Sequence, residues 1–253
     1  MSTWTADDGS TIYFEMFNNK EGVGPPLLLL PGLLGTISSQ WRNFLKPLSS
    51  DYRVILMDLR GHGRSENNAA GLNANRMLQD VIGLLDYLQI TAVHIAGYSL
   101  GGYIGLMMAA TSPRRVSSLL IHATKFYWTP ESVAKMQRQL DPDLMAEKVP
   151  TYADQLVQEH GARQWRELVR EAAALITDIA QTGLREKNLE NIQCPVLVSV
   201  GERDELVPLM EVQRLSRMLP HGELLVLPGV HHPYPTLQLI PLLPMMQHFF
   251  KQG

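Results

Sequence analysis

A serine between two glycines is the residue of this chain best suited to covalent chemistry. Residues 97–101 read Gly-Tyr-Ser-Leu-Gly and directly follow the apolar run 92–96. A strand that ends in G-x-S-x-G and continues into a helix turns so sharply that the serine hydroxyl projects above the sheet edge. Gly97 and Gly101 are needed because the turn brings the backbone on either side of Ser99 too close for side chains. The spacing therefore predicts a nucleophilic serine at position 99.

A serine hydroxyl is a weak nucleophile at neutral pH, so a base must take its proton. Imidazole can do so because its ordinary pKa, about 6.5, lets it accept and return a proton near neutrality. A carboxylate on the other ring nitrogen would fix the tautomer and stabilise the imidazolium. The candidate acids follow the apolar run 196–200, and their G-x-x-D spacing favours Asp204. The flanking Glu202 and Glu205 are more typical of solvated turn residues.

The candidate bases are two adjacent histidines, His231 and His232, in the turn that begins at Gly229. Neighbouring side chains on a turn cannot both face Ser99, so only one of the two can be the base. Pro233 restricts the residue before it to an extended backbone, which would help to hold the His232 imidazole still.

Short apolar segments separated by helical patterns would position these residues. The segments are 11–16, 27–30, 52–57, 93–96, 116–121, 196–200 and 224–227. Most are continuously apolar rather than alternating, which indicates parallel strands buried on both faces and connected by helices. A helix is expected over 237–250, where Pro241 and Pro244 must break or delay it. We therefore expect an α/β fold with a mostly parallel sheet flanked by helices.

The stretch 125–191 has no strand pattern and instead shows charged and apolar residues at helical spacing. It predicts a small helical lid inserted into a core made of residues 1–124 and 192–253. Such an insertion would lie over the carboxyl edge of the sheet, where ligands bind in open α/β folds.

The composition fits a single globular domain and excludes several classes of partner. A chain of 253 residues with a net charge of −3 gives no reason to expect nucleic acid or an anionic membrane. The N-terminus lacks the features of a secretory signal, so we expect a cytoplasmic protein. The single Cys194 excludes an internal disulfide and a cysteine-based metal cluster. No metal or nucleotide motif is found, so neither a metal nor a cofactor is expected. The oligomeric state stays open.

Five motifs in order resemble those of the α/β-hydrolase-fold superfamily over nearly the whole chain. They are the strand and loop at 27–35, a D-x-R-G-x-G-x-S turn at 58–65, G-x-S-x-G at 97–101, G-x-x-D at 201–204 and G-x-x-H at 229–232. The chain order of serine, acid and histidine is also that of this superfamily. The resemblance implies the fold much more specifically than it implies the substrate.

The resemblance also assigns roles to individual residues. In the family the catalytic histidine lies three residues after the glycine, so His232 is expected to be the base that serves Ser99, with Asp204 as its acid. The backbone N–H groups of Leu33 and Leu100 are expected to form the oxyanion hole.

The loop at Pro31 and Gly32 departs from the His-Gly of many family members. It resembles that of serine esterases similar to valacyclovir hydrolase. The missing histidine normally braces the loop, so a working oxyanion hole is still expected.

The implied function is hydrolysis of esters of small to medium apolar substrates through an acyl-enzyme on Ser99. The expected substrate pocket consists of Leu34, Tyr98, Phe126, Trp128 and Trp165. The aromatic residues among them could equally fix the lid helices to the sheet. The alternatives that stay open are a lactonase, a thioesterase, a C–C bond hydrolase or a perhydrolase, or a ligand receptor that keeps the triad with little turnover.

The remaining histidines are given structural or surface roles. We expect His62 to be structural in its glycine turn and His94 and His122 to be packed against the sheet. Residues His160, His221 and His248 have no motif context and are expected at the surface.

Overall fold

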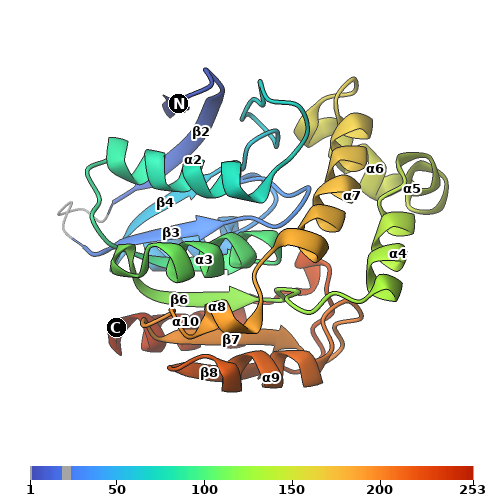
Figure 1. Cartoon of the computed structure of the whole chain (residues 1–253). Coiled ribbons are helices and arrows are strands. Elements are labelled where there is room, and N and C mark those ends of the chain that lie inside the picture. Colours follow the sequence, from blue (N-terminus) through green and yellow to red (C-terminus); the bar gives the residue numbers. More distant parts are fainter. Residues whose placement is uncertain (1, 19–23, 253) are drawn as a thin grey trace.

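The computed structural model describes residues 2–18 and 24–252. In this part of the chain eight strands form one sheet, in the order β1-β2-β4-β3-β5-β6-β7-β8 (Figure 1). The strands are β1 (Ser2–Thr5), β2 (Thr11–Phe17), β3 (Pro26–Leu30), β4 (Arg53–Met57), β5 (Val93–Tyr98), β6 (Val116–His122), β7 (Val196–Gly201) and β8 (Gly222–Leu227). From β4 to β8 all neighbours pair in parallel, while β1 and β2 pair antiparallel at one edge. The predicted fold class is confirmed.

The apolar runs are strands, and those in the middle of the sheet have both faces buried, as the sequence predicted, whereas the run 224–227 lies in the edge strand β8 and is partly exposed. In β3, Leu28 and Leu30 belong to the buried cluster on one face of the sheet, and Leu27 and Leu29 belong to the cluster on the other. Strand β1 has no such pattern, because it is an edge strand whose residues are largely exposed. No pattern in the sequence therefore predicted β1.

Helices cover both faces of the sheet (Figure 1). Helices α1 (Arg42–Leu48) and α10 (Leu239–Gln252) bury their apolar residues in the cluster that contains Leu27 and Leu29. Helices α2 (Ala74–Tyr87), α3 (Leu100–Thr111) and α9 (Leu209–Met218) bury their apolar residues in the cluster that contains Leu28 and Leu30. The three layers hold the carboxyl ends of the parallel strands in fixed positions relative to one another.

Proline affects only the start of α10. Ile240 has a non-helical backbone (φ −106°, ψ 129°), so the regular helix starts after it, as expected from Pro241. Pro244 lies inside the helix without breaking it. Because the i−4 partner of Pro244 is Ile240, its missing N–H removes only the first hydrogen bond of the regular helix.

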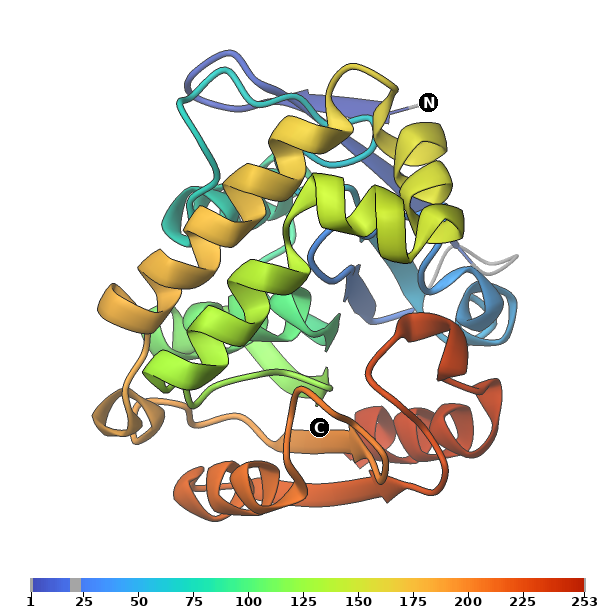
Figure 2. The ribbon, with the colours of Figure 1, turned by 90° about the vertical axis from the view of Figure 1, so that its right-hand side faces the viewer.

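Five helices lie between β6 and β7, all within 125–191. They are α4 (Pro130–Gln139), α5 (Pro142–Lys148), α6 (Pro150–His160), α7 (Trp165–Thr182) and α8 (Glu186–Leu189). Figures 1 and 2 show α4 to α7 beyond the carboxyl ends of the parallel strands, and we call residues 130–189 the helical insertion. Its buried residues join the same apolar cluster as α2 and α3. Among the described helices, none is long and apolar enough to cross a membrane.

Candidate active site

Ser99 lies on the sharp turn between β5 and α3. Its backbone has φ 49° and ψ −112°, a conformation that L residues rarely adopt. Two backbone hydrogen bonds hold it there: Ser99 N donates to the carbonyl of His122 at 2.8 Å, and Tyr103 N donates to the carbonyl of Ser99 at 3.1 Å. Strain of this kind persists only where the surrounding structure imposes it, and it is found most often at functional sites.

The two glycines of the turn are required for different reasons. A Cβ on Gly97 would lie 2.4 Å from the backbone nitrogen of Gly102, so the turn itself excludes a side chain there. A Cβ on Gly101 would lie 2.4 Å from the carbonyl oxygen of Leu30 at the end of β3. Gly101 therefore allows α3 to approach β3. The position of Gly101 in the G-x-S-x-G motif does not predict this contact.

Asp204 and His232 are brought together from the ends of two neighbouring strands. The Nδ1 atom of His232 lies 2.9 Å from Oδ2 and 3.1 Å from Oδ1 of Asp204, whose side chain is fully buried. The backbone N–H groups of Leu206 and Val207 also donate to Oδ1. Because an ionised carboxylate can only accept, Nδ1 carries the proton and donates it in a hydrogen bond, and the Nε2 atom of His232 is left as the acceptor.

The neighbouring histidine and glutamates have other partners. His231 pairs through Nδ1 with Glu205 at an exposed position, and Glu202 accepts a hydrogen bond from Gly229 N at 3.1 Å. Among the three acidic residues that the sequence left as candidates, Asp204 is the one that contacts His232 through its side-chain oxygens.

Tyr98 holds the backbone of the histidine turn. Its hydroxyl donates to the carbonyl of His232, and the two rings lie 5.8 Å apart between centroids. Burial raises the pKa of the Tyr98 phenol far above its usual range, so this donor stays protonated. The side chain that was expected to line the pocket instead positions the candidate base.

The predicted oxyanion hole has two free donors. Leu33 and Leu100 both line the small cavity beside Ser99. Within the described ranges, neither of their backbone N–H groups donates to an acceptor. Leu100 is the first residue of α3, where the helix dipole also favours negative charge. The two groups are therefore available to an oxyanion.

Gln40 braces the loop in which a histidine is missing. Its side-chain oxygen accepts a hydrogen bond from Gly32 N at 2.7 Å, and the side chain is buried. A Cβ on Gly35 would lie 2.2 Å from Gln40 Nε2, so the loop is wrapped tightly around this amide. No sequence signal pointed to Gln40, because its contact depends on how the loop folds back.

His160 is buried, so its expected position at the surface is wrong. It ends α6, and its Nδ1 accepts a hydrogen bond from Gly63 N at 2.9 Å. Its Nε2 lies 3.0 Å from the carbonyl oxygen of Leu34, which can only accept, so the proton is on Nε2. His160 thus ties the helical insertion to the loop that carries Leu33.

The other histidines lie where the sequence placed them. His62, His94 and His122 are buried, while His221 and His248 are exposed. Burial lowers the pKa of His62 and of His122 to about 4. His122 and His94 bond Ser199 and Ser118 through Nδ1, at 3.0 Å and 2.8 Å, respectively.

The cavity beside Ser99 is small, with a volume of about 30 Å³. Its lining residues are Leu33, Ser99, Leu100, Tyr103, Lys125, Trp128, Met136, Ile176, Ile179 and Leu206. Of the five expected pocket residues, Trp128 lines this cavity. Leu34 and Trp165 are packed in the core, Tyr98 contacts the histidine turn, and Phe126 lines a different hollow.

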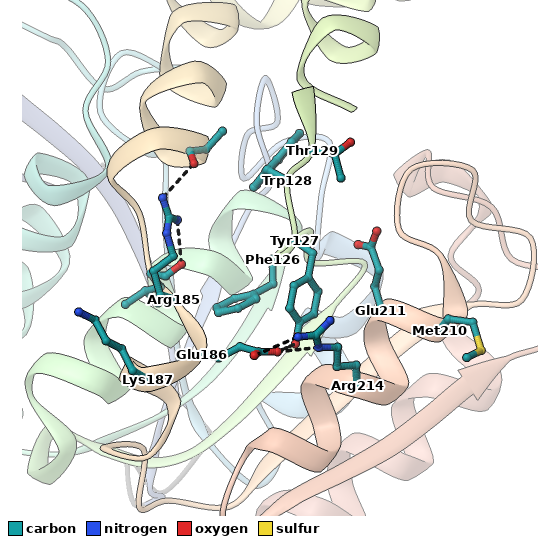
Figure 3. Close-up of a pocket in the computed structure, with 12 residues that line it drawn as sticks. Phe126, Tyr127, Trp128, Thr129, Arg185, Glu186, Lys187, Met210, Glu211 and Arg214 are labelled. Atoms are coloured by element: carbon teal, nitrogen blue, oxygen red, sulfur yellow. Dashed lines mark hydrogen bonds and ion pairs between the residues drawn. The ribbon is translucent and has the colours of Figure 1, made fainter. Parts of the chain in front are cut away.

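Two larger hollows adjoin the cavity. One, of about 550 Å³, contains His232 and shares Met136 and Leu206 with the Ser99 cavity. The other, of about 1010 Å³, shares Trp128 with it and is drawn in Figure 3. The largest hollow thus contains neither Ser99 nor His232, so its size alone does not identify the site.

Comparisons with known proteins agree with this arrangement. Residues 25–164 match the family described as alpha/beta hydrolase fold. RutD of Pseudomonas savastanoi pv. phaseolicola, provisionally named a carbamate hydrolase, is 32% identical over 226 residues, which cover 80% of this chain and 85% of that protein. The acetyltransferase component of an acetoin-cleaving system from Pseudomonas putida is 30% identical, and the match covers 83% of this chain but 59% of that longer protein.

A solved structure shows the same fold along the whole chain. It is a thermophilic esterase from Thermogutta terrifontis with bound malate, 22% identical with a TM-score of 0.82. The alignment covers 100% of this chain and 99% of the esterase. The superfamily recognised from the five motifs is thus confirmed, and this chain belongs to the α/β-hydrolase family.

Proposed function

We propose that this chain hydrolyses carboxylic esters through an acyl-enzyme intermediate on Ser99. The observation that carries the proposal is the contact between His232 Nδ1 and the buried carboxylate of Asp204 at 2.9 Å. That contact leaves Nε2 of His232 free to act as a base. His232 and Ser99 both follow strands at the carboxyl edge of the sheet.

The chemistry follows from these positions in two halves. The oxygen of Ser99 attacks the ester carbonyl while His232 Nε2 takes its proton, and the oxyanion accepts hydrogen bonds from the N–H groups of Leu33 and Leu100. His232 then returns the proton to the leaving alcohol. A water molecule then attacks the acyl-enzyme while His232 takes its proton, and the acid is released from Ser99.

The hollows favour one orientation of the substrate. The leaving group must lie near His232, which lines the hollow of about 550 Å³. The acyl group then falls into the cavity of about 30 Å³ beside Ser99. A cavity of this size holds about one or two water molecules, so short acyl groups are favoured over long ones.

A carbamate hydrolase is the second candidate. The 32% identity to RutD, over most of both chains, favours it. A carbamoyl group has a single small substituent on its carbonyl carbon, which also suits the small cavity. Release of ammonia from carbamates, compared with acid release from acetate and butyrate esters, would separate the two candidates.

The test of the mechanism is turnover together with covalent labelling. The wild type should hydrolyse p-nitrophenyl acetate over many cycles, and a fluorophosphonate should add mass at Ser99. Ser99→Ala should lose labelling and lower kcat by ~10⁴-fold or more. One burst without further turnover would point to a ligand receptor, and wild-type activity in Ser99→Ala would disprove the mechanism.

A further inference from the structure

The cavity beside Ser99 has two hydrogen-bond donors in an otherwise mainly apolar wall, of which one has no acceptor and the other is partly satisfied. The indole Nε1 of Trp128 is buried and has no hydrogen-bond partner within the described structure. Lys125 lines the same cavity, and its side chain is 6% exposed. Buried donors are almost always paired in native proteins, so an unpaired one beside a nucleophile indicates a missing ligand atom.

The ammonium group of Lys125 is only partly satisfied. Its Nζ lies 2.8 Å from Oε1 and 2.6 Å from Oε2 of Glu211, which accounts for two of its three N–H bonds. The third has no acceptor in the part of the chain that the structure describes. Nζ also lies 5.9 Å from the centre of the Trp128 ring, so the two donors are neighbours.

The charges around the cavity favour a neutral acceptor. Glu211 compensates the charge of Lys125, so the site offers donors without a net positive charge for a carboxylate. Figure 3 shows Glu211 and Trp128 at the large hollow, and Trp128 also lines the Ser99 cavity. In that hollow Glu186 accepts hydrogen bonds from Tyr127 and Arg214. Trp128 and Lys125 both line the Ser99 cavity, whereas Lys125 does not line the large hollow.

We propose that Trp128 Nε1 and Lys125 Nζ recognise an uncharged oxygen atom on a short acyl group, such as an ether, hydroxyl or keto oxygen. This inference rests on the proposed ester hydrolysis and makes these two residues determinants of acyl specificity. The acyl carbonyl is held at Ser99, and the small cavity limits the chain beyond it to a few atoms. An oxygen in that chain supplies an acceptor for the unpaired indole N–H of Trp128 and for the remaining N–H of Lys125.

The experiment compares two activated esters of the same size. The p-nitrophenyl esters of methoxyacetate and butyrate differ by an oxygen in place of one methylene group. Each kcat/KM value is divided by the rate constant of hydroxide-catalysed hydrolysis, which removes the difference in intrinsic reactivity. The wild type should prefer methoxyacetate by ~10-fold after this correction, the effect of one good hydrogen bond.

Two independent changes should each weaken the preference, because each removes one of the two donors. Trp128→Phe keeps an aromatic ring but removes the N–H, and the double change Lys125→Met with Glu211→Gln removes the ion pair without leaving a lone charge. Tyr127→Phe is the matched control, because it removes a polar group next to Trp128 that does not line the Ser99 cavity. Its corrected preference should equal that of the wild type.

The outcomes separate this inference from the proposed function. If the wild type turns over both esters without a preference, or Trp128→Phe keeps the preference, acyl recognition by these donors is wrong while ester hydrolysis stands. If the wild type hydrolyses neither ester, the proposed function itself is overturned, and the inference with it.

Discussion

Replacing His160 by phenylalanine should damage catalysis from a distance through the loop that carries Leu33. The change keeps a ring of similar shape but removes hydrogen bonds to Gly63 N at 2.9 Å and to the Leu34 carbonyl at 3.0 Å. The Leu34 carbonyl is buried and the Gly63 N–H is part-buried, so the loss of their partners costs up to about 1–3 kcal/mol each. Since domains of this kind are typically stable by about 5–15 kcal/mol, the variant should fold with a lower melting temperature.

The effect on rate comes from the position of Leu33. The next residue, Leu34, has a φ of 60°, and the bond from His160 to its carbonyl helps to hold this unfavourable conformation. Without that bond the Leu33 N–H is less well aimed at the oxyanion. Loss of a whole oxyanion donor lowers kcat by about 10²–10³-fold, so a misaligned one should lower it by ~10-fold. KM should change little, because the cavity walls remain.

The control is His94→Phe, which removes a buried histidine far from the loop. His94 lies at the start of β5 and bonds Ser118 at 2.8 Å. This variant should lower the melting temperature and leave kcat unchanged. Both variants are measured by thermal unfolding and by steady-state hydrolysis of p-nitrophenyl acetate, well below the lower melting temperature. A wild-type kcat in folded His160→Phe would refute the positioning role.

Three further predictions concern the candidate base, its acid and pH. His232→Ala should lower kcat for p-nitrophenyl acetate nearly as much as loss of the nucleophile, while His231→Ala should keep most activity; the reverse result would show that the assignment is off by one residue. Asp204→Asn should lower kcat by ~10⁴-fold, because an amide favours the wrong tautomer, and a loss below tenfold would contradict its role. The pKa of His62 and His122 is about 4 in the folded state, below the ordinary 6.5, so the unfolded chain binds these protons first. The free energy of unfolding, measured in urea, should therefore be at its largest above pH 6.5 and smaller at pH 5.5. Equal free energies of unfolding above pH 6.5 and at pH 5.5 would contradict this.

The fold could be predicted from the sequence because each of its signals is local. A parallel strand buried on both faces must be apolar at every position, and Leu27 to Leu30 meet that requirement within four residues. The elbow is equally local, since Gly97 is required by backbone only a few residues away. Strand β1 lacked a signal because an exposed edge strand needs no apolar pattern.

The candidate site was predictable in part, because three of its residues belong to short turns at strand ends. The sequence alone placed Ser99, Asp204 and His232 at the carboxyl edge, and the contact between the last two is present in the folded chain. Their catalytic roles stay predictions until activity is measured. The residues of the pocket were harder to predict from the sequence. Trp128 lines the Ser99 cavity, whereas Leu34 and Trp165 are packed in the core.

Only the tertiary structure revealed the residues that support the site. His160 bonds groups that are 97 and 126 residues away in the chain, and Gln40 bonds a loop that folds back over it. A histidine at the end of an amphipathic helix has the same local sequence whether it faces water or a buried carbonyl. Local spacing sets which strand ends carry chemistry, but burial and long-range hydrogen bonding depend on packing between elements. The sequence could therefore predict the candidate reacting residues, while packing decided which side chains support them and which line the cavity beside Ser99.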